Sequence, residues 1–532
     1  MRLNILKSEG TNKAIMFSMS FSMIAKVFTF AQSMVVSYAF GTQKSTDILF
    51  YVLSMIILLT TLLSSVNQQV IIPTTIDIRN NASEEDSKKF ISYVYIIYLI
   101  IGALMTSILL TAPDRIFAVF SKFGIEDIRS NISIIRYILP AFLFIIVNTY
   151  VLDVFTTYRY FTLPMVLDMV KNVIIISFVL IFRDVFSVES LAIGVFVGNL
   201  TQFLILNFLL FAVLKCRFSF KRYRLSPLVK KNIVYVIFGQ LTTFLNGFII
   251  MYLMSGFDEG VYSAMDYSQK INTVFSLVIV GQIATVVGMN IIEHYTKNRL
   301  DKINQTFISY LKVSLFFIIP FCFLVSLCAE PIISIVFERG RFTKDAVRLA
   351  SGFLKYFILT IPYILVNSFV VRLIIAKQIQ KIAFWWQVSQ SAGSAIIIWL
   401  TIRFLGYYGY PVGALAANYI YIFLLLYFLL RYQFKFIDNI LVIKYFILNM
   451  GFNVIVTVLT ASLTQWIERS SSLLTKLLYL LIVSIVYMAL YLTLGYITRI
   501  NRDITTKVVL FAKDKIKSRL TAGTLKKMSS DS

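Results

Sequence analysis

The sequence predicts an all-α protein that crosses a membrane many times. Hydrophobic residues make up 58% of its 532 residues and charged residues only 14%, whereas about a quarter of a soluble protein is charged. Apolar runs of roughly 20 residues, the length that a helix needs to span a bilayer, follow one another along the chain. These observations favour a polytopic membrane protein over a soluble enzyme.

Fourteen of these runs are long enough to be transmembrane helices. The first run is too long, and too polar at Lys26, for a cleaved signal peptide, so we expect it to persist as a helix. The predicted helices lie near residues 15–39, 47–73, 90–112, 132–157, 161–183, 189–214, 232–256, 271–293, 306–337, 351–376, 383–402, 410–431, 440–466 and 473–497.

Lysine and arginine gather in the two tails and in the loops that follow even-numbered helices. Basic loops stay on the cytoplasmic side, so we expect both termini to be cytoplasmic. The net charge of +24 then requires no nucleic acid. In the tail, Ala512, Ile516 and Leu520 share one helical stripe among lysines. This stripe fits an amphipathic helix on anionic lipids as well as it fits a solvated basic tail.

Few residues of this chain are suited to metal binding or covalent catalysis. Three scattered cysteines and the single His294 provide neither a disulfide framework nor a His/Cys metal site. The sequence also lacks a Gly-rich phosphate loop and a recognisable nucleophile. We therefore expect no metal, no cofactor and no enzymatic activity.

An internal repeat divides the chain. The stretch "RYILPAFLFIIVNTYVLDVF" (136–155) aligns with "KYFILTIPYILVNSFVVRLI" (355–374) at an offset of 219, and Asp47 and Asp266 share that offset. Six helices per repeat is an even number, so the halves should be parallel and related by an axis along the membrane normal. The predicted parts are a six-helix half (1–214), a basic cytoplasmic linker (215–231), a second six-helix half (232–431), two further helices (432–497) and a basic cytoplasmic tail (498–532).

A charged corner between apolar helices carries the most specific motif. The stretch "PIISIVFERGRFTKDA" (331–346) resembles the MurJ (MviN) lipid II flippases of the MOP exporter superfamily, as does "AKVFTFAQSMVVSYAFGTQKSTDILF" (25–50). The resemblance covers essentially the whole chain. The matching positions are Val27, Phe30, Phe40, Gly41, Thr46, Asp47 and Phe50 in the first stretch and Pro331, Phe337, Glu338, Gly340, Phe342 and Thr343 in the second.

The resemblance implies a MurJ/MATE-like flippase that moves an undecaprenyl-diphosphate-linked sugar from the cytoplasmic to the outer leaflet. It implies a cationic cavity between the halves and a lipid-tail groove on helices 13 and 14. The family's cavity arginines correspond to Lys26, Gln32, Thr60 or Thr61, and Lys270, so two become lysine and two lose their charge. Lysine lacks the bidentate fork of arginine. The substrate-binding residues that we predict are Lys26, Lys270, Gln32, Asp47 and Thr60.

Other charges within the predicted helices have two interpretations. Asp153 is the repeat equivalent of Arg372, and Asp168 lies three residues before Lys171 on one helical face. These residues form either an ion or proton relay or structural pairs between helices. In the outer corner we expect Pro331, Glu338, Arg339 and Gly340 to organise the turn rather than to touch substrate.

Three alternative functions stay open at this point. A flippase for an O-antigen, capsule or exopolysaccharide intermediate would use the same diphosphate chemistry. A MATE-type multidrug or cation antiporter would ordinarily have twelve helices and an acidic cavity. A membrane glycosyltransferase or polymer ligase would need a larger catalytic outer loop. Besides its lipid-linked substrate, we expect contacts with anionic lipids and with cell-envelope biosynthesis proteins. The glycan, the coupling ion and the oligomeric state are not determined by the sequence.

Overall fold

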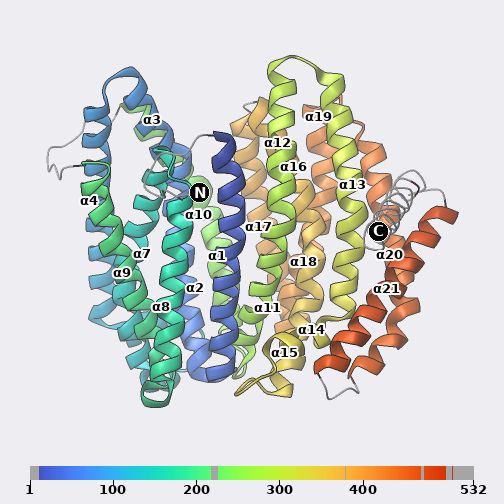
Figure 1. The fold of residues 1–532 in the computed structure, drawn as a ribbon, viewed down its shortest axis with the longest axis horizontal. Helices are drawn as coiled ribbons and strands as arrows, with labels where there is room; N and C mark the ends of the chain where they lie inside the picture. The colour runs from blue at the N-terminus through green and yellow to red at the C-terminus, as the bar shows by residue number, and fades with distance from the viewer. Residues whose placement is uncertain (1–10, 217–225, 378, 469–472, 499–505, 507–532) are drawn as a thin grey trace, which may run out of the picture. The chain divides into compact units, whose positions relative to one another are not determined.

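The structure is a computed structural model that describes all residues except 1–10, 217–225, 378, 469–472, 499–505 and 507–532 (Figure 1). All of its described secondary-structure elements are helical. The predicted tail stripe, and much of the predicted basic linker and tail, lie outside the described residues. Contacts group the chain into two compact units. The first comprises Met1–Val274, Val336–Leu354 and Gln380–Ala417, and the second comprises Phe275–Ile335, Lys355–Ile379 and Asn418–Ser532.

Twelve helical segments among the described residues are long and apolar enough to cross a membrane. The chain is therefore an all-α polytopic membrane protein. Thirteen of the predicted helices fall in these segments, because Lys381–Gln433 holds two of them. There the chain reverses at Gly406, whose φ of 62° is left-handed. Residues 271–293 are helical but are not among the twelve segments, so the count of fourteen stays a prediction.

The first unit contains a group of helices that pack side by side. Helix α8 packs against α1 and α9, α7 packs against α2, α4 and α9, and α10 packs against α2 and α17. Its elements are α1 (Thr11–Phe40), α2 (Lys44–Val66), the π-helical segment η1 (Asn67–Ile71), α3 (Ile72–Asn81), α4 (Glu84–Thr111), α5 (Pro113–Phe120), α6 (Ile125–Ser130), α7 (Ile132–Thr157), α8 (Thr162–Phe186), α9 (Glu189–Ala212), α10 (Pro227–Met254), α17 (Gln380–Leu405) and the 3-10 segment η4 (Gly406–Tyr408).

The second unit is held together by polar contacts as well as by apolar packing. Tyr487 and Tyr491 of α21 donate hydrogen bonds to the amide oxygens of Asn453 (2.9 Å) and Asn449 (3.0 Å) of α20. Its elements are η2 (Ser276–Val280), α12 (Gly281–Thr296), α13 (Leu300–Leu327), η3 (Ile358–Thr360), α16 (Ile361–Lys377), η5 (Leu425–Leu430), α19 (Arg431–Gln433), α20 (Asn439–Glu468) and α21 (Leu473–Ile497).

Four helices contain residues of both units: α11 (Val261–Phe275), α14 (Ala329–Phe337), α15 (Lys344–Phe357) and α18 (Gly409–Leu424). The expected single helix over 306–337 was wrong at its end. Helix α13 ends at Leu327, and α14 begins anew at Ala329, with Pro331 in its first turn, where a missing N–H costs no helical hydrogen bond.

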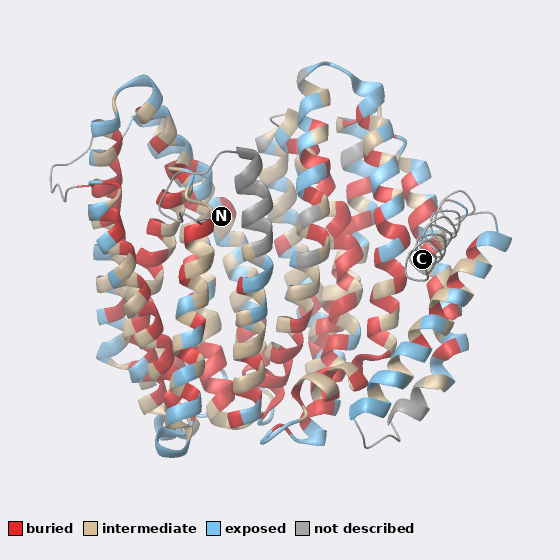
Figure 2. Ribbon diagram, in the orientation of Figure 1, coloured by how far each residue is buried: buried red, intermediate tan, exposed pale blue. Residues whose placement is uncertain are grey.

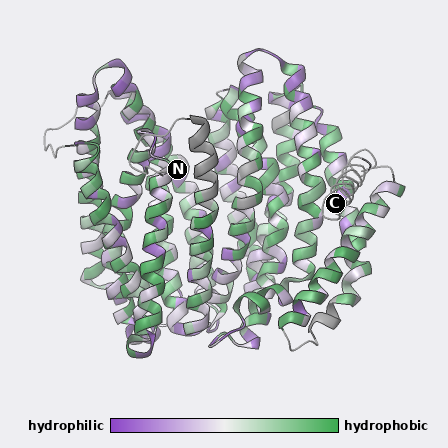
Figure 3. Cartoon of the chain, viewed as in Figure 1, coloured by the Kyte–Doolittle hydropathy of each residue, from purple (hydrophilic) through white to green (hydrophobic). Residues whose placement is uncertain are grey.

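Hydropathy and burial follow the pattern of a membrane protein. The bodies of the helices are largely hydrophobic, and the α3–α4 connection and the start of α4 are hydrophilic (Figure 3). Exposed residues occur along many helices (Figure 2). Many of the exposed residues are apolar, including Ile181 of α8, Phe208 of α9 and Val458 of α20, each more than 60% exposed. Such surfaces suit contact with lipid tails rather than with water.

Candidate functional site

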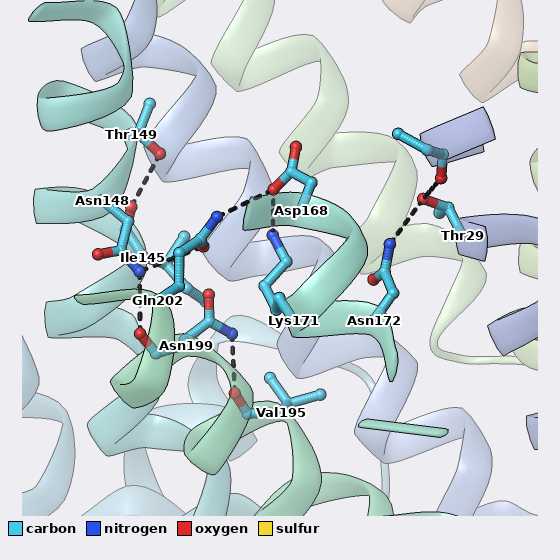
Figure 4. A network of polar contacts seen from close by, with 11 residues as sticks. Thr29, Ile145, Asn148, Thr149, Asp168, Lys171, Asn172, Val195, Asn199 and Gln202 are labelled. Carbon is cyan, nitrogen blue, oxygen red and sulfur yellow. Dashed lines mark hydrogen bonds and ion pairs between the residues drawn. The ribbon is translucent and has the colours of Figure 1, made fainter. Parts of the chain in front are cut away.

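A polar cluster inside the first unit contains one carboxylate and its hydrogen-bond donors. Lys171 of α8 places its Nζ 2.8 Å from Asp168 Oδ1. Gln202 of α9 donates from Nε2 to the same oxygen at 3.1 Å (Figure 4). The side chains of Lys171 and Asp168 are 24% and 45% exposed, respectively, so the pair is reachable from outside the protein. Asp168 and Lys171 therefore pair, as their three-residue spacing allows.

Close packing of α8 and α9 sets the position of this pair. An added Cβ at Gly198 of α9 would lie 3.2 Å from the carbonyl oxygen and 3.3 Å from the Cγ of Lys171. A larger residue there would push the lysine stem away. On the other side of Gln202, Asn148 of α7 donates to the Gln202 amide oxygen at 3.3 Å and to the Asn199 carbonyl at 3.0 Å. Helices α7, α8 and α9 thus share one hydrogen-bonded network (Figure 4).

Helix α1 brings a second lysine to this cluster. Asn172 of α8 donates to the hydroxyl oxygen of Thr29 at 3.0 Å, which fixes α1 against α8 (Figure 4). Lys26 lies one helical turn before Thr29, is half-buried, and interacts electrostatically with Asp168. Asp168 therefore experiences the charges of two lysines from two helices. Lys26 lies in the candidate membrane span Met23–Phe40, about 21 Å along α1 from the end of the helix at Phe40.

Asp47 occupies a different kind of site. Its side chain is 1% exposed, in the first turn of α2. Oδ2 accepts the backbone N–H of Gly260 and Oδ1 accepts that of Ser263, each at 2.7 Å. Both donors belong to the start of α11, where the first N–H groups of a helix have no partner within the helix. Both oxygens of Asp47, a predicted substrate-binding residue, are thus occupied within the protein.

Lys270 is also engaged by neighbours. Its Nζ lies 2.7 Å from Asp266 Oδ2, one turn earlier in α11. The same ammonium lies 4.0 Å from the ring centroid of Phe50 and 5.3 Å from that of Tyr267. A carboxylate and two aromatic faces therefore surround the charge.

The remaining predicted binding residues are neutral. The Thr60 hydroxyl donates to the Ile56 and Ile57 carbonyls of its own helix at 2.8 and 2.9 Å. Gln32 is half-buried on α1. Neither position supplies the positive charge that the family resemblance associates with it.

Asp153 and Arg372 lie in separate units and have separate environments. Asp153 Oδ2 accepts a hydrogen bond from the Asn67 amide at 3.0 Å, at the start of the π-helical segment η1. Arg372 of α16 lies against Gly288 of α12, where an added Cβ would come within 2.7 Å of the arginine Cδ. Their role as a relay stays a prediction.

The outer-corner motif packs on the end of α1. Gly340 has φ of 61° and Gly41 has φ of 60°. A Cβ on Gly340 would strike the Tyr38 carbonyl oxygen, and a Cβ on Gly41 would strike that of Arg341. The Arg341 N–H donates to the Tyr38 carbonyl at 3.0 Å. Only glycine combines this backbone conformation with so close an approach.

An analogous contact involves residues 112–129, between α4 and α7. The Lys122 N–H donates to the Ser255 hydroxyl at 2.8 Å, and the Lys122 side chain packs on Gly256. In addition, the Lys44 N–H donates to Glu259 Oε1 at 3.0 Å.

The other predicted residues of the 331–346 motif differ in burial. Pro331 is buried in α14, Glu338 is half-buried, and Arg339 is exposed.

The structure brings together residues that sequence reasoning did not connect. Lys26 was predicted to bind substrate and Asp168–Lys171 to pair, but nothing in the sequence placed them together. Thr29, Asn172 and Gln202 were not predicted at all, and their one signal was a polar side chain within an apolar helix. No group of three or more metal-ligating side chains occurs among the described residues.

Comparisons with known proteins identify the family of the chain. A family model described as "Lipid II flippase MurJ" matches residues 36–485. A probable lipid II flippase MurJ of Borreliella burgdorferi is 23% identical over 411 residues, which are 76% of this chain and 79% of the relative.

Solved structures show the same fold. A lipid II flippase MurJ in an inward closed conformation has a TM-score of 0.73 at 19% identity, and the match covers 92% of this chain and 99% of that one. An inward-facing MATE multidrug transporter of the MOP superfamily has a TM-score of 0.61 at 15% identity, covering 77% and 95%. The fold is thus MurJ- and MATE-like, and the extent of the family match shows that the chain belongs to the lipid II flippase MurJ family, a family of transporters and not of enzymes.

Proposed function

We propose that this protein moves lipid II, an undecaprenyl-diphosphate-linked peptidoglycan precursor, from the cytoplasmic to the outer leaflet. The observation that carries the proposal is a pair of lysines, Lys26 and Lys171, near one carboxylate inside a chain of this family. A lysine in the membrane interior costs about 2.5–3.5 kcal/mol to insert. Such residues ordinarily face a partner, a cavity or a transported group. A diphosphate supplies the negative charge that two lysines and one carboxylate leave unbalanced.

The proposed architecture follows from the repeat. Fourteen transmembrane helices would form two parallel six-helix halves, 1–214 and 232–431, followed by two helices over 432–497 that provide a groove for the lipid tail. Such repeats alternate the exposure of a site by rocking one half on the other. We place both termini in the cytoplasm of a bacterial inner membrane, because the basic loops and tails lie on that side. Anionic lipids and cell-envelope biosynthesis proteins are the proposed partners.

Complementation tests this proposal. A bacterium depleted of its own lipid II flippase should grow when it expresses this chain, and Lys26→Ala at equal membrane abundance should fail to restore growth. Lys297→Ala, which removes an exposed lysine paired with Glu293, is the matched control and should restore growth. Lack of rescue by the well-expressed wild-type protein would contradict lipid II as the substrate.

A second lipid-linked glycan is the alternative substrate. The family's arginine positions that correspond to Gln32 and Thr60 carry no charge in this chain. This difference favours a test of O-antigen, capsule and exopolysaccharide intermediates, which share the diphosphate. Reconstituted vesicles that contain either lipid II or a lipid-linked O-antigen unit would separate the two substrates by the rate at which each reaches the opposite leaflet.

A further inference from the structure

Lys171 is paired with a carboxylate whose hydrogen-bond donors are all side chains. Its partner Asp168 receives both of its hydrogen bonds from side chains, those of Lys171 and Gln202, and on one oxygen, Oδ1. Side chains exchange partners by rotating, whereas backbone donors cannot. An incoming oxygen atom that took the place of Oδ1 would therefore find two donors already aimed at it.

The charges of the cluster are unequal. Lys26 and Lys171 together contribute two positive charges, and Asp168 contributes one negative charge. A carboxylate and a phosphate both accept hydrogen bonds from ammonium and amide groups. Asp168 thus satisfies Lys171 in the way that a phosphate of the substrate would.

We propose that Lys171 is a substrate-binding residue of this chain and that the diphosphate of the lipid-linked substrate displaces Asp168 from it. The proposal rests on the proposed function. It adds one binding residue, Lys171, and one step in which the partner of that residue changes from Asp168 to the diphosphate. Lys171 would supply a positive charge to the substrate, whereas the predicted binding residues Gln32 and Thr60 carry none. Gln202 is a positioning residue, since its amide directs the exchanged oxygen toward Lys171.

A purely structural ion pair predicts different mutant behaviour. If Asp168 and Lys171 served only to neutralise each other, removing either one would leave an unpaired charge and removing both would restore the protein. If Lys171 binds substrate, replacing Asp168 with neutral asparagine weakens the competition for the lysine, and replacing both residues leaves the site without the lysine. The double variant therefore distinguishes the two roles.

The test uses the purified full-length protein with undecaprenyl diphosphate as the probe, with binding measured by native mass spectrometry. We expect Lys171→Gln to weaken binding about tenfold, because one hydrogen bond between charged groups is lost. Asp168→Asn should bind at least as tightly as the wild type. Asp168→Asn combined with Lys171→Gln should bind as weakly as Lys171→Gln alone. Lys171→Arg should retain most of the binding, and Lys297→Gln is the matched control, from another lysine–carboxylate pair on one helix.

Two results would overturn the inference: wild-type affinity in Lys171→Gln, or affinity restored in the double variant. Thermal unfolding of each variant shows whether it is folded. If Lys171→Gln does not fold, Asp168→Asn decides, because weaker binding in that variant contradicts the proposed exchange. Failure of the wild type itself to bind the probe or to transport lipid II would contradict the proposed function. Normal transport by the wild type, together with unchanged binding in Lys171→Gln, would contradict only this inference.

Discussion

Asp47 and Asp168 are both carboxylates of the first unit, but they are held in opposite ways. Asp47 is fully buried and uses both oxygens to accept backbone N–H groups of α11. Asp168 is 45% exposed at its side chain and receives two side-chain donors on one oxygen. Because a backbone donor moves only when its helix moves, Asp47 keeps its hydrogen bonds unless α11 itself shifts. Asp168 can change partner while its helix stays in place.

The sharpest way to test this contrast is the same substitution at both sites. Asp47→Asn puts an NH2 group against one of two buried backbone N–H donors, which loses an acceptor at a cost of about 1–3 kcal/mol. We expect a clearly lower midpoint of thermal unfolding for the purified protein. An unchanged midpoint would show that the contact with α11 contributes little to stability.

Asp168→Asn should have a smaller effect on stability. The asparagine carbonyl can still accept from both Lys171 and Gln202, because both donate to one oxygen. We expect an unfolding midpoint closer to that of the wild type than in Asp47→Asn, measured in the same detergent. Equal losses at the two sites would remove the distinction between a fixed and an exchangeable carboxylate.

Lys270→Gln should change substrate binding least. Asp266 and the rings of Phe50 and Tyr267 already surround the Lys270 ammonium, so it has less freedom to turn toward a ligand than Lys26. We expect a smaller loss of undecaprenyl diphosphate binding than in Lys26→Gln. A larger loss would place the diphosphate at Lys270 instead.

Much of the fold was predictable because apolar length is a strong signal. Helix bodies such as α7 and α21 follow directly from runs of about 25 apolar residues. The end of α13 was missed because the apolar run continues through Ala329 and Ile333, so hydropathy does not mark the break. The reversal at Gly406 was predicted as a gap between two helices.

The site was less predictable than the fold. The pair Asp168–Lys171 follows from helical spacing, which is a local property. The contact of Thr29 with Asn172 joins residues 143 positions apart, and only tertiary packing places them together. Asp47 stood out in the sequence as half of a repeated pair, but its backbone partners on α11 carry no sequence signature.

The contacts around Gly41 and Gly340 belong to a set that joins equivalent positions of the two proposed repeats. In the two repeats proposed above, residues 41–44 are equivalent to residues 260–263, and the segment from Lys44 to Asp47 contacts residues 259–263. The corner of the first repeat bonds the end of α10 through Lys122, and the corner of the second bonds the end of α1 through Arg341. Such reciprocity defines an isologous interface, the kind that joins identical subunits about a two-fold axis. The two proposed repeats thus contact each other as two copies of one subunit would.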